Sequence, residues 1–217
     1  MVCWYCRGHA IKQINIPFNN NNKISFIDAH KKVYSNWRTF SPGILFSFHT
    51  FMYIALFTFL PGLSGNENTR SLLLVILPLI SIAGTMIAGI ASQYFISPSK
   101  LSIFAYISLL ALIFAVRLSF DNILLFVIAS MILILFSGII QGSVFSLIPK
   151  ISLTTEDQTN ANGSIAQLGN LGSTLGSPVF SYFLVYGRDS IIIIVMLLSI
   201  LGAISGIYIT KKIRKNK

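Results

Sequence analysis

Long apolar runs, separated by short polar connections, dominate the chain between residues 41 and 211. A helix that crosses the hydrocarbon core of a bilayer needs about 20 predominantly apolar residues. Because the connections are short, we expect neighbouring helices to be antiparallel. The pattern predicts an all-α integral membrane protein with six transmembrane helices. Their approximate ranges are Pro42–Pro61, Ser71–Phe95, Leu101–Leu118, Asn122–Ile148, Asn160–Tyr186 and Ile191–Thr210.

The segments outside these runs are polar. Residues 1–40 include the low-complexity run Asn19–Asn22 and show little patterning. We therefore expect a poorly ordered cytoplasmic leader, with a short helix near Ile24–Tyr34. Residues 41–211 are predicted to form the transmembrane domain, and residues 212–217 a basic cytoplasmic tail.

The composition indicates a surface that faces lipid. Of the 217 residues, 54% are hydrophobic and 10% are charged, and the mean hydropathy is +0.75, whereas a soluble domain has about 25% charged residues. The net charge of +10 would suit nucleic acid, but nucleic-acid-binding proteins gather their basic residues on one face of the fold. Here the basic residues flank apolar segments, so we expect no nucleic-acid partner. We predict a multi-pass location in the cell inner (plasma) membrane.

The basic residues also predict the orientation of the chain. With six spans, thirteen of the sixteen Lys and Arg residues fall on the side of the termini. Cytoplasmic segments of membrane proteins carry an excess of Lys and Arg, so both termini are predicted to be cytoplasmic. The thirteen are Arg7, Lys12, Lys23, Lys31, Lys32, Arg38, Lys100, Lys150, Lys211, Lys212, Arg214, Lys215 and Lys217, and the other three are Arg70, Arg117 and Arg188.

The fifth apolar segment is unusually polar, because residues 167–178 read QLGNLGSTLGSP. At 100° of rotation per residue, a helix here has a polar stripe, an apolar face and a face of small residues. Polar groups at membrane depth cost free energy unless they are paired or face a wet cavity. Hydrogen bonding between helices is one interpretation, and a water-lined pathway, which the alignment of five polar residues favours, is the other. The polar stripe consists of Gln167, Asn170, Thr174, Ser177 and Ser181, and the apolar face of Leu168, Leu171, Leu175, Val179 and Tyr182.

The small-residue face predicts a close contact between helices. Gly172 and Gly176 form a GxxxG pattern next to Gly169, and the fourth segment has a second one at Gly138 and Gly142. Small residues let helix backbones approach closely in a membrane. The four glycines of the fifth segment would otherwise destabilise a helix by about 4 kcal/mol relative to alanine. We therefore expect the five named glycines to be helix-packing residues.

Two other segments contribute to the predicted pathway. Gln141 shares a helix face with two serines, and His49 and Tyr53 lie within one arc of the first segment. His49 is the one ionisable side chain deep in a predicted span, and both a buried core role and a substrate or proton role fit it. The predicted substrate pathway comprises Gln167, Asn170, Thr174, Ser177, Gln141, His49 and Tyr53.

Several motifs resemble the major facilitator superfamily of transporters. The first set is Gly142…Pro149, Asn162-Gly163 and residues 167–178, which is similar to the tenth-to-eleventh helix region of that family. The second set is Asn36-Trp37-Arg38, Ser41-Pro42, Tyr53 and Phe59-Leu60-Pro61, which looks like the entry into its seventh helix. The resemblance covers about residues 36–212.

This resemblance implies the C-terminal six-helix half of a twelve-helix transporter, with inner helices around a central cavity and the third and sixth helices peripheral. Two features depart from the family. The six N-terminal helices are absent from the sequence, and the basic loop motif is reduced to Ser97-Pro98-Ser99-Lys100.

The implied function is alternating-access transport of a small solute by a partial or truncated secondary transporter. We expect it to need a complementary six-helix half or to form a homodimer in the lipid bilayer. The alternative is a transport-inactive fragment, or a structural subunit that needs a partner half. Neither hypothesis requires a cofactor or an enzymatic activity.

Two further motifs suggest other chemistry less strongly. Gly62-Leu63-Ser64-Gly65 matches the GxSG pattern of an intramembrane serine protease, but such an enzyme needs a histidine on a later helix, and all three histidines precede Ser64. Cys3 and Cys6 form a CxxC motif. A zinc site needs four ligands, and no such set is evident near these cysteines, so we predict no metal site.

Overall fold

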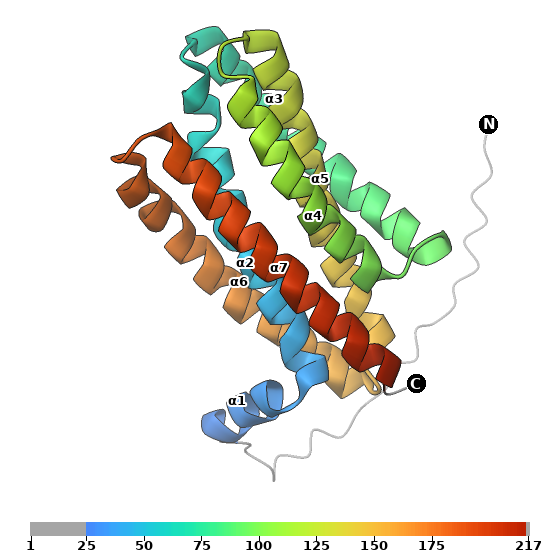
Figure 1. Ribbon diagram of the computed structural model, residues 1–217. Coiled ribbons are helices and arrows are strands. Elements are labelled where there is room, and N and C mark those ends of the chain that lie inside the picture. The colour runs from blue at the N-terminus through green and yellow to red at the C-terminus, as the bar shows by residue number, and fades with distance from the viewer. Residues whose placement is uncertain (1–24, 216–217) are drawn as a thin grey trace, which may run out of the picture.

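The computed structural model describes residues 25–215, which form a bundle of long α-helices without strands (Figure 1). This confirms the prediction of an all-α fold. The helices are α1 (Phe26–Ser35), α2 (Trp37–Phe59), α3 (Glu67–Tyr94), α4 (Pro98–Leu118), α5 (Ile123–Ile151), α6 (Thr155–Leu184) and α7 (Arg188–Lys215), with a short 3-10 helix at Pro61–Ser64. The leader predicted for residues 1–40 is described only from residue 25, where α1 covers most of the helix expected near Ile24–Tyr34.

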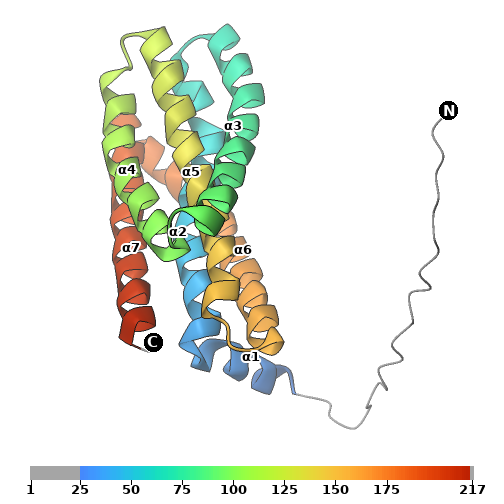
Figure 2. The same ribbon diagram turned by 90° about the vertical axis from the view of Figure 1, so that its right-hand side faces the viewer.

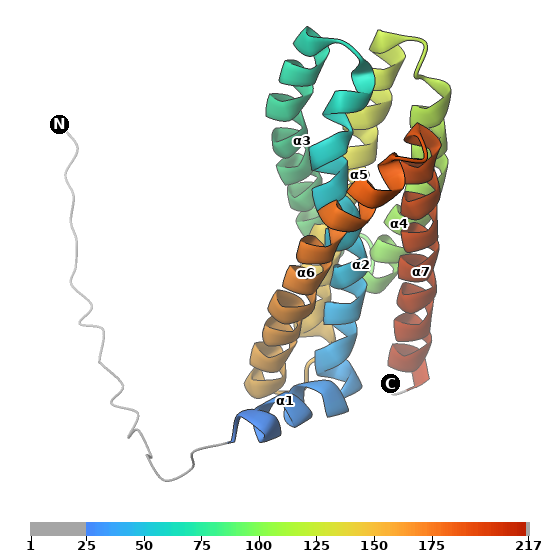
Figure 3. The ribbon, with the colours of Figure 1, turned by 90° about the vertical axis from the view of Figure 1, so that its left-hand side faces the viewer.

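The six long helices run up and down through the bundle and pack mainly in pairs (Figures 1 and 2). The most extensive contacts join α2 to α6 and α3 to α5, while α4 packs between α5 and α7. The short α1 lies across the ends of α2 and α6 (Figure 3). The polar stretch at residues 167–178 lies within α6 and is therefore part of a helix of the bundle and not a loop.

Five of the described helices are long and apolar enough to cross a membrane: α2, α3, α4, α5 and α7. This chain therefore has the character of a multi-pass membrane protein. The helix α6 is not among the five although it has 30 residues, because amides, hydroxyls and glycines lower its hydropathy. Its role as a sixth span stays a prediction.

Local sequence explains where the helices begin. Asn66, Asn122 and Thr154 each accept a hydrogen bond from the backbone N–H three residues later, which satisfies one of the free donors of a first turn. Asn36 accepts from the N–H of Arg38, so α2 begins five residues before the predicted Pro42. The cap at Thr154 likewise starts α6 five residues before the predicted Asn160.

The up-and-down course separates the basic residues of the described chain. Arg70, Arg117 and Arg188 lie next to the connections at one end of the bundle (Figure 1). Nine others lie at the opposite end, in α1, at the start of α2 and α4, and at the ends of α5 and α7. We call this opposite end the basic end. It includes residues 212–215 of the predicted tail, since α7 continues to Lys215.

The backbones of α2 and α6 are in contact at glycines. A Cβ atom added at Gly176 would lie 2.3 Å from the carbonyl oxygen of Phe51, and one at Gly172 would lie 2.5 Å from that of Ser47. Gly169 lies against the Phe46 ring. Any larger residue at these positions would force the two helices apart.

The backbones of α3 and α5 are also in contact at glycines. A Cβ atom at Gly138 would lie 2.2 Å from the carbonyl oxygen of Ser81, and one at Gly142 would lie 2.5 Å from that of Thr85. The contact is reciprocal, because a Cβ atom at Gly84 of α3 would lie 2.2 Å from the carbonyl oxygen of Leu135. The two GxxxG patterns thus lie at the two most extensive helix contacts.

We predict that Gly176→Ala lowers the free energy of unfolding by about 1–3 kcal/mol, the usual cost of overpacking. Gly163→Ala, on the same helix, is the matched control, because a Cβ atom there meets no other atom within 4 Å. The control should leave the free energy of unfolding unchanged or raise it by up to about 1 kcal/mol through helix propensity. Denaturant titration in mixed micelles, followed by circular dichroism, measures both. Equal stability of the two variants would contradict the backbone contact.

Candidate functional site

A cavity of about 240 Å³ lies between α2, α5 and α6. Four of the seven predicted pathway residues line it, namely His49, Tyr53, Gln141 and Asn170. Segments that are far apart in the sequence meet here, because α2 packs against both α6 and α5. The complete lining is Phe46, His49, Thr50, Tyr53, Ile54, Gln141, Ile165, Ala166, Gly169, Asn170 and Ser173.

One wall of the cavity belongs to a column of rings on α2. Phe46, His49, Tyr53 and Phe57 recur at spacings of three and four residues, so their side chains share one face of the helix. Successive ring centroids are 5.6, 5.0 and 4.5 Å apart. These are contact distances for aromatic pairs, so the column is one continuous packed surface.

His49 is buried and is held by α5. Its Nε2 atom lies 3.0 Å from the hydroxyl oxygen of Ser137. Its Nδ1 atom has no hydrogen-bond partner among the described residues. One ring nitrogen therefore fixes the imidazole to the neighbouring helix, and the other keeps its hydrogen-bonding capacity next to the cavity.

Tyr53 connects the same column to α3. Its hydroxyl group donates a hydrogen bond of 3.0 Å to the hydroxyl oxygen of Ser81, which is buried at the contact with Gly138. The two polar side chains of the column thus bond in different directions, His49 to α5 and Tyr53 to α3. Movement of either helix relative to α2 would change the environment of the cavity.

The other wall comes from α6, whose polar stripe lies mostly on the surface of the chain. Gln167, Asn170, Thr174 and Ser181 are exposed, and Ser177 is half-buried. The stripe therefore leads from the cavity, at Asn170, along an uncovered face of α6. The predicted apolar face includes Leu171, Leu175 and Tyr182, which are also exposed.

Three of the predicted pathway residues lie outside the cavity. Gln167 accepts a hydrogen bond of 2.5 Å from the hydroxyl group of Tyr34 in α1. Thr174 and Ser177 lie further along α6 and are absent from the lining. The helical spacing places these residues in one stripe, but the cavity spans only part of the length of the helix.

Several polar residues of the site are not among the predicted pathway residues. Thr50 lines the cavity and donates a hydrogen bond of 3.0 Å to the carbonyl oxygen of Gly169. Ser173 also lines it, while Ser137 and Ser81 hold the two polar rings. Ser137 shares its helix face with the predicted Gln141, four residues on, which was an available signal. Ser81 has no such neighbour among the predicted residues, and only the pairing of α3 with α5 reveals it.

The motifs for other chemistry lie partly within the described chain. The hydroxyl group of Ser64 donates a hydrogen bond of 2.9 Å to the carbonyl oxygen of Pro61, in the 3-10 helix at the end opposite the basic end. Within residues 25–215, no group of three or more His, Cys, Asp or Glu side chains could hold a metal ion. Cys3 and Cys6 lie outside the described residues.

Comparison with known proteins adds no family to this description. No protein-family model matches the chain, and neither the curated proteins nor the solved structures contain a match.

We predict that water reaches the cavity wall of α6 and does not reach its apolar face. In a variant without native cysteines (Cys3→Ser, Cys6→Ser), a cysteine at Asn170 should react with a small hydrophilic thiol reagent in membranes. A cysteine at Leu171, the next residue, should stay protected, because this side chain is exposed on the apolar face that we expect to contact lipid. Mass spectrometry of the labelled protein measures both rates. Equal protection would favour the alternative that the polar residues only bond to other helices.

Proposed function

We propose that this chain is one six-helix half of a secondary transporter of the major facilitator type, which moves a small solute by alternating access. In this proposal α2 to α7 cross the membrane and the basic end is cytoplasmic, so both termini are inside. The observation that carries the proposal is the polar stripe of α6, which opens from the cavity onto an uncovered face of the bundle. A substrate path between two halves would have this form.

The geometry of α6 supports its role as a sixth span. A helix of 30 residues is about 45 Å long at 1.5 Å per residue, which exceeds the roughly 30 Å of the hydrocarbon core. It packs along α2, a candidate span, and runs in the same direction, since Gly43 lies against Ser164 at one end of the contact and Phe51 against Gly176 at the other. Polar side chains at this depth are tolerated where they line a cavity or meet protein, so low hydropathy is compatible with a span that faces a substrate path.

The cavity has the chemical character of a small-molecule site. Such sites combine apolar and aromatic walls with a few polar groups that fix the orientation of the ligand. Here the column on α2 supplies the aromatic wall, and Gln141, Asn170 and Ser173 supply amide and hydroxyl groups. A volume of about 240 Å³ in one half would be completed by the facing half.

The outer helices also fit this proposal. The helices α4 and α7 pack against each other and correspond to the third and sixth spans, which the family resemblance makes peripheral. Secondary transporters bind substrate near the bilayer midplane at the interface between repeats and rock one unit against the other. A single half has no second unit to rock against.

The same exposed stripe implies a partner. Each unsatisfied polar group in an apolar environment costs about 1–3 kcal/mol, and three residues of the stripe besides the bonded Gln167 are exposed, namely Asn170, Thr174 and Ser181. We propose that a complementary half or a second copy of this chain covers them. The alternative, a transport-inactive fragment or structural subunit, would also recruit a partner through this face but would not alternate its access.

Alternating access can be tested without knowing the substrate. In the variant without native cysteines, a cysteine at Asn170 should be modified by a membrane-impermeant thiol reagent applied to either side, in inside-out and in right-side-out vesicles. A cysteine at Asn66 should react only from outside and one at Asn216 only from inside, because six spans place these sites on opposite faces. Mass shifts of the protein report each reaction.

The controls separate the parts of the proposal. Reaction of Asn216→Cys from outside would show five spans and overturn the topology. Reaction of Asn170→Cys from one side only, with both controls as expected, would favour the inactive fragment or structural subunit.

We also predict that one chain alone does not alternate. In vesicles reconstituted at limiting dilution, with about one chain each, Asn170→Cys should lose its reaction from one of the two sides. Crosslinking in parallel should show dimers at the higher protein-to-lipid ratio at which reaction from both sides returns. Reaction from both sides in vesicles shown to hold single chains would rule out the need for a partner.

A further inference from the structure

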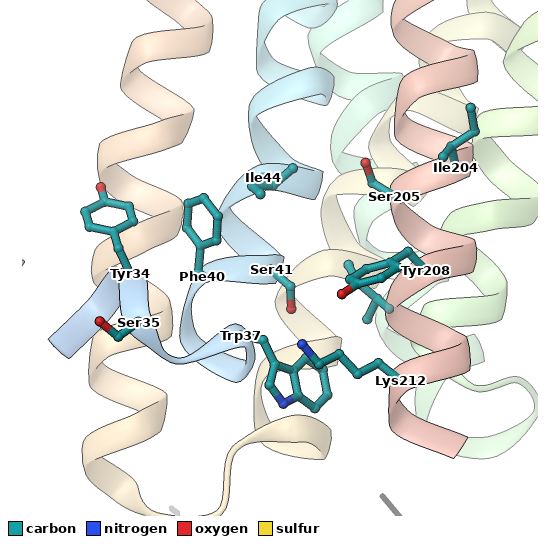
Figure 4. A pocket seen from close by; sticks show the side chains of 11 residues that line it. Tyr34, Ser35, Trp37, Phe40, Ser41, Ile44, Ile204, Ser205, Tyr208 and Lys212 are labelled. Carbon is teal, nitrogen blue, oxygen red and sulfur yellow. The ribbon is translucent and has the colours of Figure 1, made fainter. Parts of the chain in front are cut away.

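A second pocket, of about 500 Å³, lies at the basic end between the start of α2 and the end of α7 (Figure 4). It does not share any lining residue with the cavity described above. Its walls are apolar toward the middle of the bundle, at Ile44 and Ile204, and aromatic and basic toward the end, at Trp37 and Lys212. The pocket is therefore amphipathic along the helix axis.

Two cations contact the Trp37 ring at the rim: Lys212, which lines the pocket, and Arg38, which follows Trp37 in the chain and lies outside the lining. The Lys212 ammonium lies 5.0 Å from the centroid of the Trp37 ring and 5.6 Å from that of Tyr208. The guanidinium carbon of Arg38 lies 5.2 Å from the same Trp37 ring. Cation–π contacts hold a side chain in place but do not neutralise its charge, so the positive charge of the rim remains available to an anion.

Among residues 25–215, no carboxylate forms an ion pair with this rim. The ion pairs of the described chain join Lys32 to Glu156, Arg70 to Glu67 and Arg117 to Asp189, and none involves Lys212 or Arg38. Residues 1–24 of the sequence contain no Asp or Glu either. Charge complementarity therefore favours an anionic occupant from outside the chain over the basic segment that precedes α1.

A buried hydroxyl group also lacks a partner in the pocket. Ser41 is 8% exposed, and its oxygen has no hydrogen-bond partner in the described structure. Buried polar groups are nearly always hydrogen-bonded. In Figure 4 the hydroxyl groups of Ser41 and Tyr208 point into the space between α2 and α7, on the side of Trp37 and Lys212. They are placed to bond an oxygen-rich group that enters at the rim.

We infer that this pocket binds the headgroup and upper acyl chain of an anionic phospholipid. The phosphate would lie against Lys212 and Arg38, its ester oxygens near the hydroxyl groups of Ser41 and Tyr208, and an acyl chain along Ile44 and Ile204. The positions of Ile204 and Lys212, eight residues apart on α7, correspond to about 12 Å along the helix. Basic pockets and aromatic side chains at the membrane–water boundary suit such lipids. The inference rests on the membrane location of the chain and not on transport.

The test uses Trp37 as the reporter. Trp4→Phe leaves Trp37 as the single tryptophan, and lipids with brominated acyl chains quench the fluorescence of a tryptophan that they contact. The full chain is reconstituted in vesicles that contain phosphatidylcholine and phosphatidylglycerol, with the bromine on one lipid or on the other. Stronger quenching by brominated phosphatidylglycerol at equal mole fraction measures the preference for the anionic lipid.

We expect a preference of about fivefold for each rim cation, from about 1 kcal/mol per basic residue near a membrane surface. Lys212→Gln should therefore lower the preference by about fivefold. Lys211→Gln is the matched control, because it removes the same charge one residue away, from an exposed position outside the pocket lining, and it should leave most of the preference. Ser205→Phe keeps all charges but fills the pocket, so it should also abolish the preference.

Each other outcome would overturn the inference. Equal quenching by the two lipids would mean that the occupant is any lipid or a segment of the chain. Equal losses in Lys212→Gln and Lys211→Gln would mean that surface charge alone attracts the lipid. Loss of the preference when inorganic phosphate is added would mean that the pocket takes a free anion and not a phospholipid.

Discussion

The contact between helix backbones at glycines is the constraint on which the rest of this structure depends. Within a bilayer, lipid tails are as apolar as leucine, so helices associate through close packing and hydrogen bonds. In both major pairs a threonine of one helix donates to the carbonyl oxygen of a glycine on the other, Thr50 to Gly169 at 3.0 Å and Thr85 to Gly138 at 3.2 Å. A hydrogen bond of this kind forms only where no side chain separates the backbones. The glycines therefore permit both the packing and the bonds that supplement it.

This constraint also places the cavity. Because α6 packs against α2 through its small-residue face, its polar stripe lies beside the aromatic column of α2. Asn170 therefore lines the same cavity of about 240 Å³ as His49 and Tyr53. The pairing of α3 with α5 brings Ser81 and Ser137 to the opposite side of that column. His49 and Tyr53 thus bond to the α3–α5 pair, His49 through Ser137 and Tyr53 through Ser81. Gln167 of the α6 stripe bonds to Tyr34, whereas Asn170, Thr174 and Ser181 are exposed in the described chain, which is the physical basis for proposing a partner outside it.

The two ends of the bundle differ in the partners of their basic side chains. At the end with three arginines, carboxylates are close by, as in the pair of Arg117 with Asp189. At the basic end, Lys32 pairs with Glu156 where α1 meets α6, but the cations of the α2–α7 pocket contact aromatic rings instead. The two proposals therefore concern separate pockets, the cavity between α2, α5 and α6 and the pocket at the basic end, which have no lining residue in common.

The local pattern of the sequence determines the helices, the faces of α6 and the glycines at its contacts, because each depends on residues within a few turns. Long apolar runs likewise indicate five candidate spans, whereas the amides and hydroxyls of α6 lower its hydropathy, so its role as a sixth span stays a proposal. The sequence alone does not determine which helix each glycine face meets. Pairing α2 with α6 and α3 with α5 depends on complementary surfaces far apart in the chain. That pairing decided that His49, Tyr53, Gln141 and Asn170 share a cavity while Gln167 bonds to Tyr34. The packing of α7 against α2 likewise created the pocket at Trp37 and Lys212, a site that no local pattern contains.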